Sequence, residues 1–179
     1  MKIILLSVLV VALFLAAGVL MINSSQSQNV TTKAAAQTAS LALSPASGNY
    51  LFDTATTYPV GILIDSGGKS VDGMDAVINF DPAKAQVVDT KVSQTTLFEE
   101  YPINTVDNQK GQIKFSGLTF NSKPTIGIAG TFKFRPLVKG EINFTFYFVP
   151  GATTDSNIAE HGTAKDVLGS VTNGRFNFK

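Results

Sequence analysis

The sequence predicts an all-β protein: a sandwich of about nine antiparallel strands with jelly-roll topology, preceded by one N-terminal hydrophobic helix. Short runs of alternating apolar and polar residues, separated by clusters of Gly, Pro, Asn and Asp, indicate the strands. No stretch after residue 40 has the periodicity of an amphipathic helix. A single domain of roughly 140 residues is a usual size and fits the 179-residue chain.

The N-terminal segment is apolar and uncharged from Ile3 to Ile22. A helix of about twenty residues spans the ~30 Å hydrocarbon core of a bilayer. We therefore expect residues 1–22 to be an uncleaved signal anchor, with a cleaved signal peptide as the alternative. Lys2 flanks the run on its N-terminal side, which favours an extracytoplasmic location for everything that follows. The membrane is thus an expected partner of this segment.

The next segment, residues 23–39, is dominated by Asn, Ser, Gln, Thr and Ala. Such a stretch cannot bury enough apolar surface to offset the entropy lost on ordering. We expect a flexible polar linker here, followed by the β-sandwich over residues 40–179.

Strand faces can be assigned in residues 73–80 and 141–148, where alternation is clearest. Successive side chains of a strand point to opposite faces, so one set in each segment is buried. The expected inward sets are Met74, Ala76, Ile78 and Phe80, and Ile142, Phe144, Phe146 and Phe148. Further strands are expected at 39–43, 58–65, 85–92 and 112–116, with turns at 66–68, 81–82, 108–111, 139–140 and 173–174.

The composition argues against catalysis and against several kinds of partner. The chain has no Cys, one histidine (His161) and a net charge of +1 without blocks of like charge. We therefore expect no catalytic residues, no thiolate or histidine metal site, no cofactor and no nucleic-acid partner. Glu99 and Glu100 are adjacent in an expected loop, whereas a glycosidase needs two carboxylates that face each other across a cleft.

Calcium binding at loop ends is an alternative. Its ligands would be drawn from Asp53, Asp65, Asp72 and Asp155, although their spacing matches no known calcium loop. We expect no metal site from this pattern.

Three segments of the chain resemble cohesin domains, the receptor modules that bind dockerins in cellulosomes and related surface assemblies. These segments are residues 39–45 with Gly48, residues 67–84, and residues 155–158 with 166–174. Residues 111–117 and 130–134 lie where cohesins have comparable strands, so the resemblance follows the whole predicted domain in order. It implies a non-catalytic, extracellular module that binds a dockerin-like protein.

The resemblance also implies a binding surface. In cohesins the partner docks on outward residues of the third strand and its neighbours, where an Asn and an Asp two residues apart are prominent in one class. Asp75 matches the second of these positions, and Gly73 stands at the first. The expected partner-binding residues are Gly73, Asp75, Val77, Asn79, Lys114 and Ser116.

Two other functions stay open from the sequence. One is a polysaccharide-binding module, since carbohydrate-binding modules share the sandwich architecture that the resemblance implies. Rings that stack on sugars are scarce, because the chain has no Trp and four Tyr. The other is a structural surface or appendage subunit that packs against its neighbours.

Overall fold

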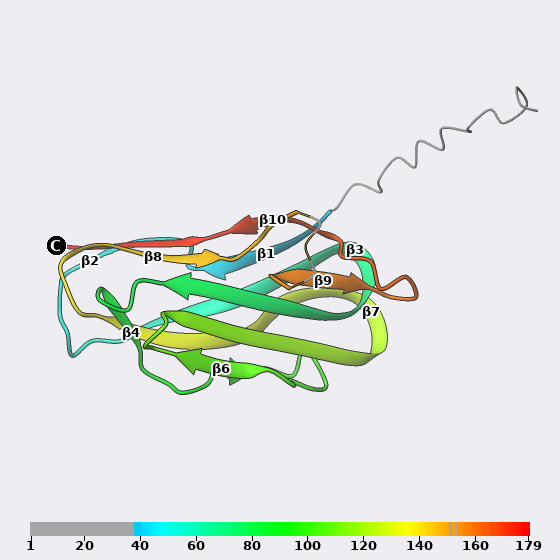
Figure 1. Ribbon diagram of the computed structural model, residues 1–179, viewed down its shortest axis with the longest axis horizontal. Coiled ribbons are helices and arrows are strands. Elements are labelled where there is room, and N and C mark those ends of the chain that lie inside the picture. The colour runs from blue at the N-terminus through cyan, green and yellow to red at the C-terminus, as the bar shows by residue number, and fades with distance from the viewer. Residues whose placement is uncertain (1–37, 151, 153) are drawn as a thin grey trace, which may run out of the picture. The chain divides into compact units, whose positions relative to one another are not determined.

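A computed structural model describes residues 38–150, 152 and 154–179, which form β-strands, turns and loops (Figure 1). The chain divides into two units, residues 1–33 and 34–179, and the described residues belong to the second. The predicted N-terminal helix of residues 1–22 and the predicted linker up to residue 37 lie outside the described residues. In the part of the chain that the structure describes, no helix has the length and apolar character needed to span a membrane.

The described residues contain eleven strands, somewhat more than the nine expected. The additional ones include the short strands β2, β5, β6 and β9, which carry little alternation. The strands are β1 Ala39–Ser44, β2 Ser47–Tyr50, β3 Tyr58–Phe80, β4 Ala85–Val87, β5 Ser93–Gln94, β6 Asn104–Asp107, β7 Gln112–Pro136, β8 Gly140–Phe146, β9 Asn157–Glu160, β10 Leu168–Thr172 and β11 Gly174–Phe178.

Two long strands, β3 and β7, organise the fold. The sequence predicts a turn at residues 66–68 that separates two strands, but β3 continues through it as one bent strand. Gly67 and Gly68 have φ of 62° and 79°, a region in which glycine is favoured because it has no Cβ. Strand β7 also bends and curves back at one end of the molecule (Figure 1). Each strand therefore has two arms.

The arms of β3 and β7 build both layers of the sandwich. Residues 58–65 of β3 and 126–134 of β7 pair with each other and join β1, β10 and β4 in the first layer. Residues 73–79 of β3 and 112–118 of β7 pair in the second layer, with β9 and β6 alongside. Strand β8 meets β3 near Phe80 and continues this layer to β11 and β2.

Strand direction differs from the prediction of purely antiparallel sheets, which is wrong for two pairs. Strands β1 and β10 run parallel, with Ala39 opposite Leu168. Strands β2 and β11 also run parallel, with Tyr50 opposite Phe178. Alternation places side chains on faces but says nothing of strand direction, so the sequence pattern could not reveal either pair.

The core between the layers is filled by aromatic rings. Phe134 of β7 contacts Phe144 of β8 and Phe176 of β11, with ring centroids 4.8 and 5.1 Å apart. Tyr58 of β3 lies 5.1 Å from the ring of Phe178. The predicted inward sets are buried, except for a half-buried Phe148, so the prediction of a Phe-rich inner face is confirmed.

Candidate functional site

The predicted contact residues come together on the outer face of the second layer, which we call the β3–β7 face: the outward side chains of residues 73–79 and 112–118, with β9 and β6 on either side. The register places Asp75 opposite Ser116 and Val77 opposite Lys114. Because side chains directly opposite on one face of an antiparallel pair are neighbours, these residues form one surface.

Asp75 is held in place by strands on both sides of β3. Its Oδ1 atom accepts a hydrogen bond from the Ser116 hydroxyl of β7. Its Oδ2 atom accepts one from the Asn157 amide of β9 at 3.2 Å. Hydrogen bonds to a carboxylate are among the stronger ones, so the orientation of the half-buried Asp75 is fixed before any partner arrives. Asn157 was not among the predicted contact residues, although it lies in a segment that carries the resemblance.

Gly73, which was among the predicted contact residues, is buried at a packing position. A Cβ atom at residue 73 would lie 2.6 Å from the carbonyl oxygen of Gly117 and 2.8 Å from Cδ2 of Leu118. Ser116 is also buried, with 4% of its surface exposed. A partner on this face would therefore meet the exposed Lys114 and the half-buried Asp75, and not Gly73.

Next to Asp75 the surface is hollowed by a pocket of about 220 Å³. This hollow could not be predicted from local sequence patterns, because its walls combine β3 and β7 with residues before β6 and before β9. It is lined by Asp75, Ala76, Val77, Ile103, Lys114, Phe115, Ser116, Thr154 and Asp155.

Exposed apolar side chains surround the polar centre of the β3–β7 face. Leu118 and Phe120 extend the outward row of β7, and Ile103 precedes β6. Tyr147 follows β8, and its backbone N–H donates to the carbonyl oxygen of Val77 at 2.7 Å. Exposed aromatic and aliphatic side chains around a polar centre are typical of protein interaction surfaces.

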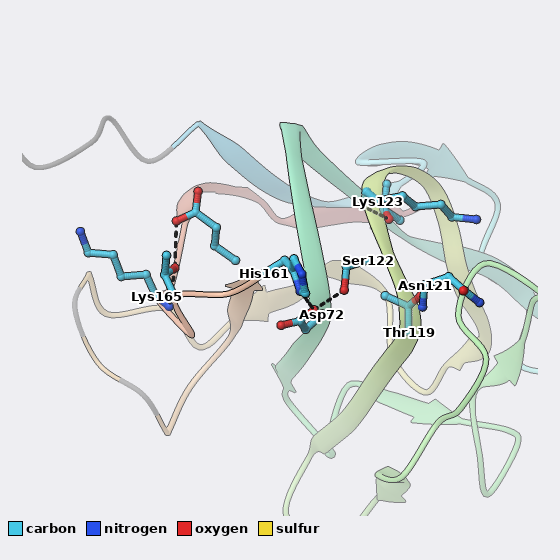
Figure 2. A network of polar contacts seen from close by, with 10 residues as sticks. Asp72, Thr119, Asn121, Ser122, Lys123, His161 and Lys165 are labelled. Carbon is cyan, nitrogen blue, oxygen red and sulfur yellow. Dashed lines mark hydrogen bonds and ion pairs between the residues drawn. The ribbon is translucent and has the colours of Figure 1, made fainter.

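A second polar cluster lies near the bends of β3 and β7 (Figure 2). Oδ1 of Asp72 accepts a hydrogen bond from the Ser122 hydroxyl and lies 2.7 Å from Nδ1 of His161. The bonds from Ser122 and His161 hold the pKa of Asp72 below its usual value.

This cluster contains the three residue types of a catalytic triad in an arrangement that does not suit one. In a triad the histidine stands between the serine and the aspartate and takes the serine proton. Here Ser122 and His161 both contact the same oxygen of Asp72. The cluster ties the segment after β9 to β3, and His161 is exposed.

The candidate calcium ligands are not gathered into one site. Among residues 38–150, 152 and 154–179, no group of three His, Asp or Glu side chains is placed to hold a metal ion. Asp53 and Asp65 instead accept backbone N–H groups two residues further on, from Ala55 and Gly67, as aspartates commonly do in turns. Asp155 is buried beside the hollow, with its Oδ2 accepting the Val149 N–H at 2.5 Å.

Comparison with known proteins places the fold. No protein-family model matches the chain, and no curated protein matches it. Similar solved structures include the third cohesin of ScaC from Acetivibrio cellulolyticus in complex with a mutated ScaB dockerin (TM-score 0.61, 14% identity, covering 78% of this chain and 98% of that chain).

Two further similar solved structures come from other organisms. CaCohA2 from Clostridium acetobutylicum has a TM-score of 0.60 at 19% identity, covering 79% of this chain and 91% of that chain. A non-cellulosomal cohesin from the archaeon Archaeoglobus fulgidus has a TM-score of 0.56 at 18% identity, with the same coverage of 79% and 91%. The prediction of a cohesin-like fold is confirmed.

Proposed function

We propose that this chain is a non-catalytic binding module that receives a dockerin-like protein on the β3–β7 face. The observation that carries the proposal is the carboxylate of Asp75, which Ser116 and Asn157 hold in a fixed orientation on that face. An interface gains affinity when its polar groups are already oriented, because less ordering entropy is lost on binding. Several structures with the same fold are complexes of cohesins with dockerins.

The face has the composition that suits a protein partner. Its polar centre of Asp75, Asn79 and Lys114 can form specific hydrogen bonds, and exposed apolar side chains such as Leu118 and Tyr147 can be buried around it. Apolar burial supplies the main driving force of association, while the polar groups select the partner.

Polysaccharide binding is less well supported by the tyrosines. Tyr50 and Tyr58 are half-buried and in ring contact with Phe178, and Tyr101 stacks on Phe115 with its hydroxyl bonded to backbone oxygens. Within the described part of the chain, this leaves Tyr147 as the tyrosine whose ring is exposed. A crystalline polysaccharide is expected to need several coplanar rings.

The proposal includes a location outside the cytoplasm, with the module tethered by residues 1–22. It is supported by the uncharged apolar run from Ile3 to Ile22. A chain tagged at its C-terminus is expected to sediment with membranes at full size. Recovery of a shortened soluble form would support secretion after cleavage instead.

The binding proposal is tested by two lysines on the same strand. Lys114 of β7 lies on the β3–β7 face, whereas Lys133 of β7 is also exposed but lies on the outer face of the other layer. Dockerin modules from the parent organism would be titrated against the full-length chain and against the variants Lys114→Ala, Lys133→Ala and Asp75→Ala. We expect Asp75→Ala to weaken binding by about 1 to 3 kcal/mol and Lys133→Ala to change it by less than about 0.5 kcal/mol.

The outcomes separate the candidate functions. An effect of Asp75→Ala no larger than that of Lys133→Ala would contradict the assignment of the face. Binding of cellulose or chitin that is lost in Tyr147→Ala, together with no binding of any dockerin, would favour the polysaccharide function.

A further inference from the structure

Among the residues that the structure describes, none donates a hydrogen bond to one carboxylate oxygen of Asp155. The residue is 2% exposed, and its Oδ2 atom accepts the Val149 N–H. Its Oδ1 atom is buried and has no hydrogen-bond partner among the described residues. Burying a carboxylate oxygen without a donor is costly, and such atoms are rare in folded proteins. Asp155 lines the hollow beside Asp75, so a donor that enters the hollow would arrive next to this residue.

The charges around the hollow favour a cation. The described residues that line it include two acidic ones, Asp155 and Asp75, and one basic one, Lys114. Lys114 forms no ion pair in the part of the chain that the structure describes. Each oxygen of Asp75 accepts a hydrogen bond already, but a carboxylate oxygen has room for a second donor.

The shape of the hollow favours a side chain over a bare metal ion. Its volume of about 220 Å³ is several times the roughly 30 Å³ that one water occupies in the liquid. Val77 and Ile103 give it apolar walls, which suit the methylene stem of a long basic side chain while its charged end stays among polar groups. Two carboxylates also fall short of the six to eight oxygen ligands that Ca²⁺ prefers.

We infer that this hollow is the site into which the partner inserts a basic side chain, with its cationic end at Asp155 and Asp75 and its stem against Val77 and Ile103. A guanidinium group fits such a site well because its planar fork of N–H donors matches a carboxylate. The inference rests on the proposed function, since it names the chemistry by which the β3–β7 face would recognise its partner.

The test uses a small probe and does not depend on finding the partner. The ¹⁵N-labelled full-length chain would be titrated with N-acetyl-arginine methylamide, and in parallel with N-acetyl-citrulline methylamide, which has nearly the same shape and no charge. We expect the arginine probe to shift the amide signals of Val77, Ser116 and Val149 in a saturable way. Because a hydrogen bond to a charged group is worth about 1.5 kcal/mol or more, the citrulline probe should bind about tenfold more weakly.

Three variants sharpen the result. Asp155→Asn keeps the shape of the side chain and removes its charge, so it should reduce binding of the arginine probe about tenfold. Asp65→Asn, on the outer face of the other layer, should leave it unchanged. Lys114→Gln should strengthen it, because a competing positive charge is removed from the wall. If Asp155→Asn fails to fold, Asp75→Asn provides the same comparison at the other acidic residue that lines the hollow.

Equal binding of the two probes, or arginine binding that is indifferent to both Asp155→Asn and Asp75→Asn, would overturn the inference. Saturable shifts of the same amides by CaCl₂ alone, tighter than those by the arginine probe, would overturn it in favour of an ion site. The proposed function is judged separately: a dockerin that binds on the β3–β7 face without loss in Asp155→Asn would refute this inference and leave the proposed function standing. Specific arginine binding without any dockerin partner would support the arginine site and refute the proposed function.

Discussion

Two phenylalanines on strand β7 provide a matched test of how the sandwich is stabilised. Phe134 has 0% of its surface exposed and packs against rings of both layers, whereas Phe120 is 70% exposed. Burying a phenyl ring removes about 150 to 250 Å² from water, which at about 25 cal/mol per Å² is worth roughly 4 to 6 kcal/mol. Alanine retains a small part of this, so Phe134→Ala should lower the free energy of unfolding by about 3 to 5 kcal/mol.

The effect is large against the roughly 5 to 15 kcal/mol of total stability that is usual for a domain. Phe120→Ala should change the free energy of unfolding by less than about 0.5 kcal/mol, as for other exposed positions. Urea unfolding of the full-length chain, followed by far-UV circular dichroism, would measure both. A loss below about 1 kcal/mol for Phe134→Ala, or similar losses for the two variants, would refute the assignment of the aromatic cluster as the core.

Other perturbations should act at single, identifiable contacts. The side chain of Asn104 donates to the backbone carbonyl of Val92 at 2.9 Å and accepts its backbone N–H at 2.8 Å. Asn104→Ala should therefore lower the free energy of unfolding, measured in urea, by about 1 to 3 kcal/mol. No loss would contradict this bridging role. Gly117→Ala would place a Cβ 2.5 Å from the Phe98 ring and should destabilise by about 1 to 3 kcal/mol; an unchanged urea midpoint would show that the ring yields freely. Ser122→Ala should raise the pKa of Asp72 toward 3.8 in a carboxyl NMR titration. The lowered pKa of Asp72 contributes stability that is present above the pKa of the unfolded state and is lost as the pH falls through the pKa of the folded state. Ser122→Ala should therefore lose part of this contribution. An unchanged pKa of Asp72 in the variant would exclude Ser122 as the cause of the shift.

The sequence could predict which side chains form the core because alternation is a local signal. Met74 and Phe144 were placed on inner faces from their neighbours in the chain alone, and both are buried. The continuity of β3 could not be predicted, because Gly67 and Gly68 ordinarily mark a turn between strands. Here their positive φ values produce a bend within β3, and the continuity of the strand is defined by its pairing with β7 on both sides of the bend.

The sequence predicts which residues of the candidate site lie on the outward face but not which of them are buried. Asp75 and Lys114 could be placed on an outward face from alternation and the resemblance to cohesins. The burial of Gly73 depends on how the side chain of Leu118 lies across it, and Leu118 is distant in the sequence. The buried Asp155 has the same origin, since a local pattern cannot say which parts of the chain will cover a loop carboxylate. The burial of Gly73 and of Asp155 therefore depends on contacts between segments that are distant in the sequence.

The position of β1 has a consequence for how the protein is made. Strand β1 pairs on one side with β3, which leaves the ribosome soon after it, and on the other side with β10, close to the far end of the domain. Bringing such distant segments together costs loop-closure entropy and slows folding. While the chain is being synthesised, the outer edge of β1 has no partner and can pair with another nascent chain. The layer is closed only when residues 168–172 arrive, so a polypeptide interrupted before that point would expose a strand edge that invites aggregation.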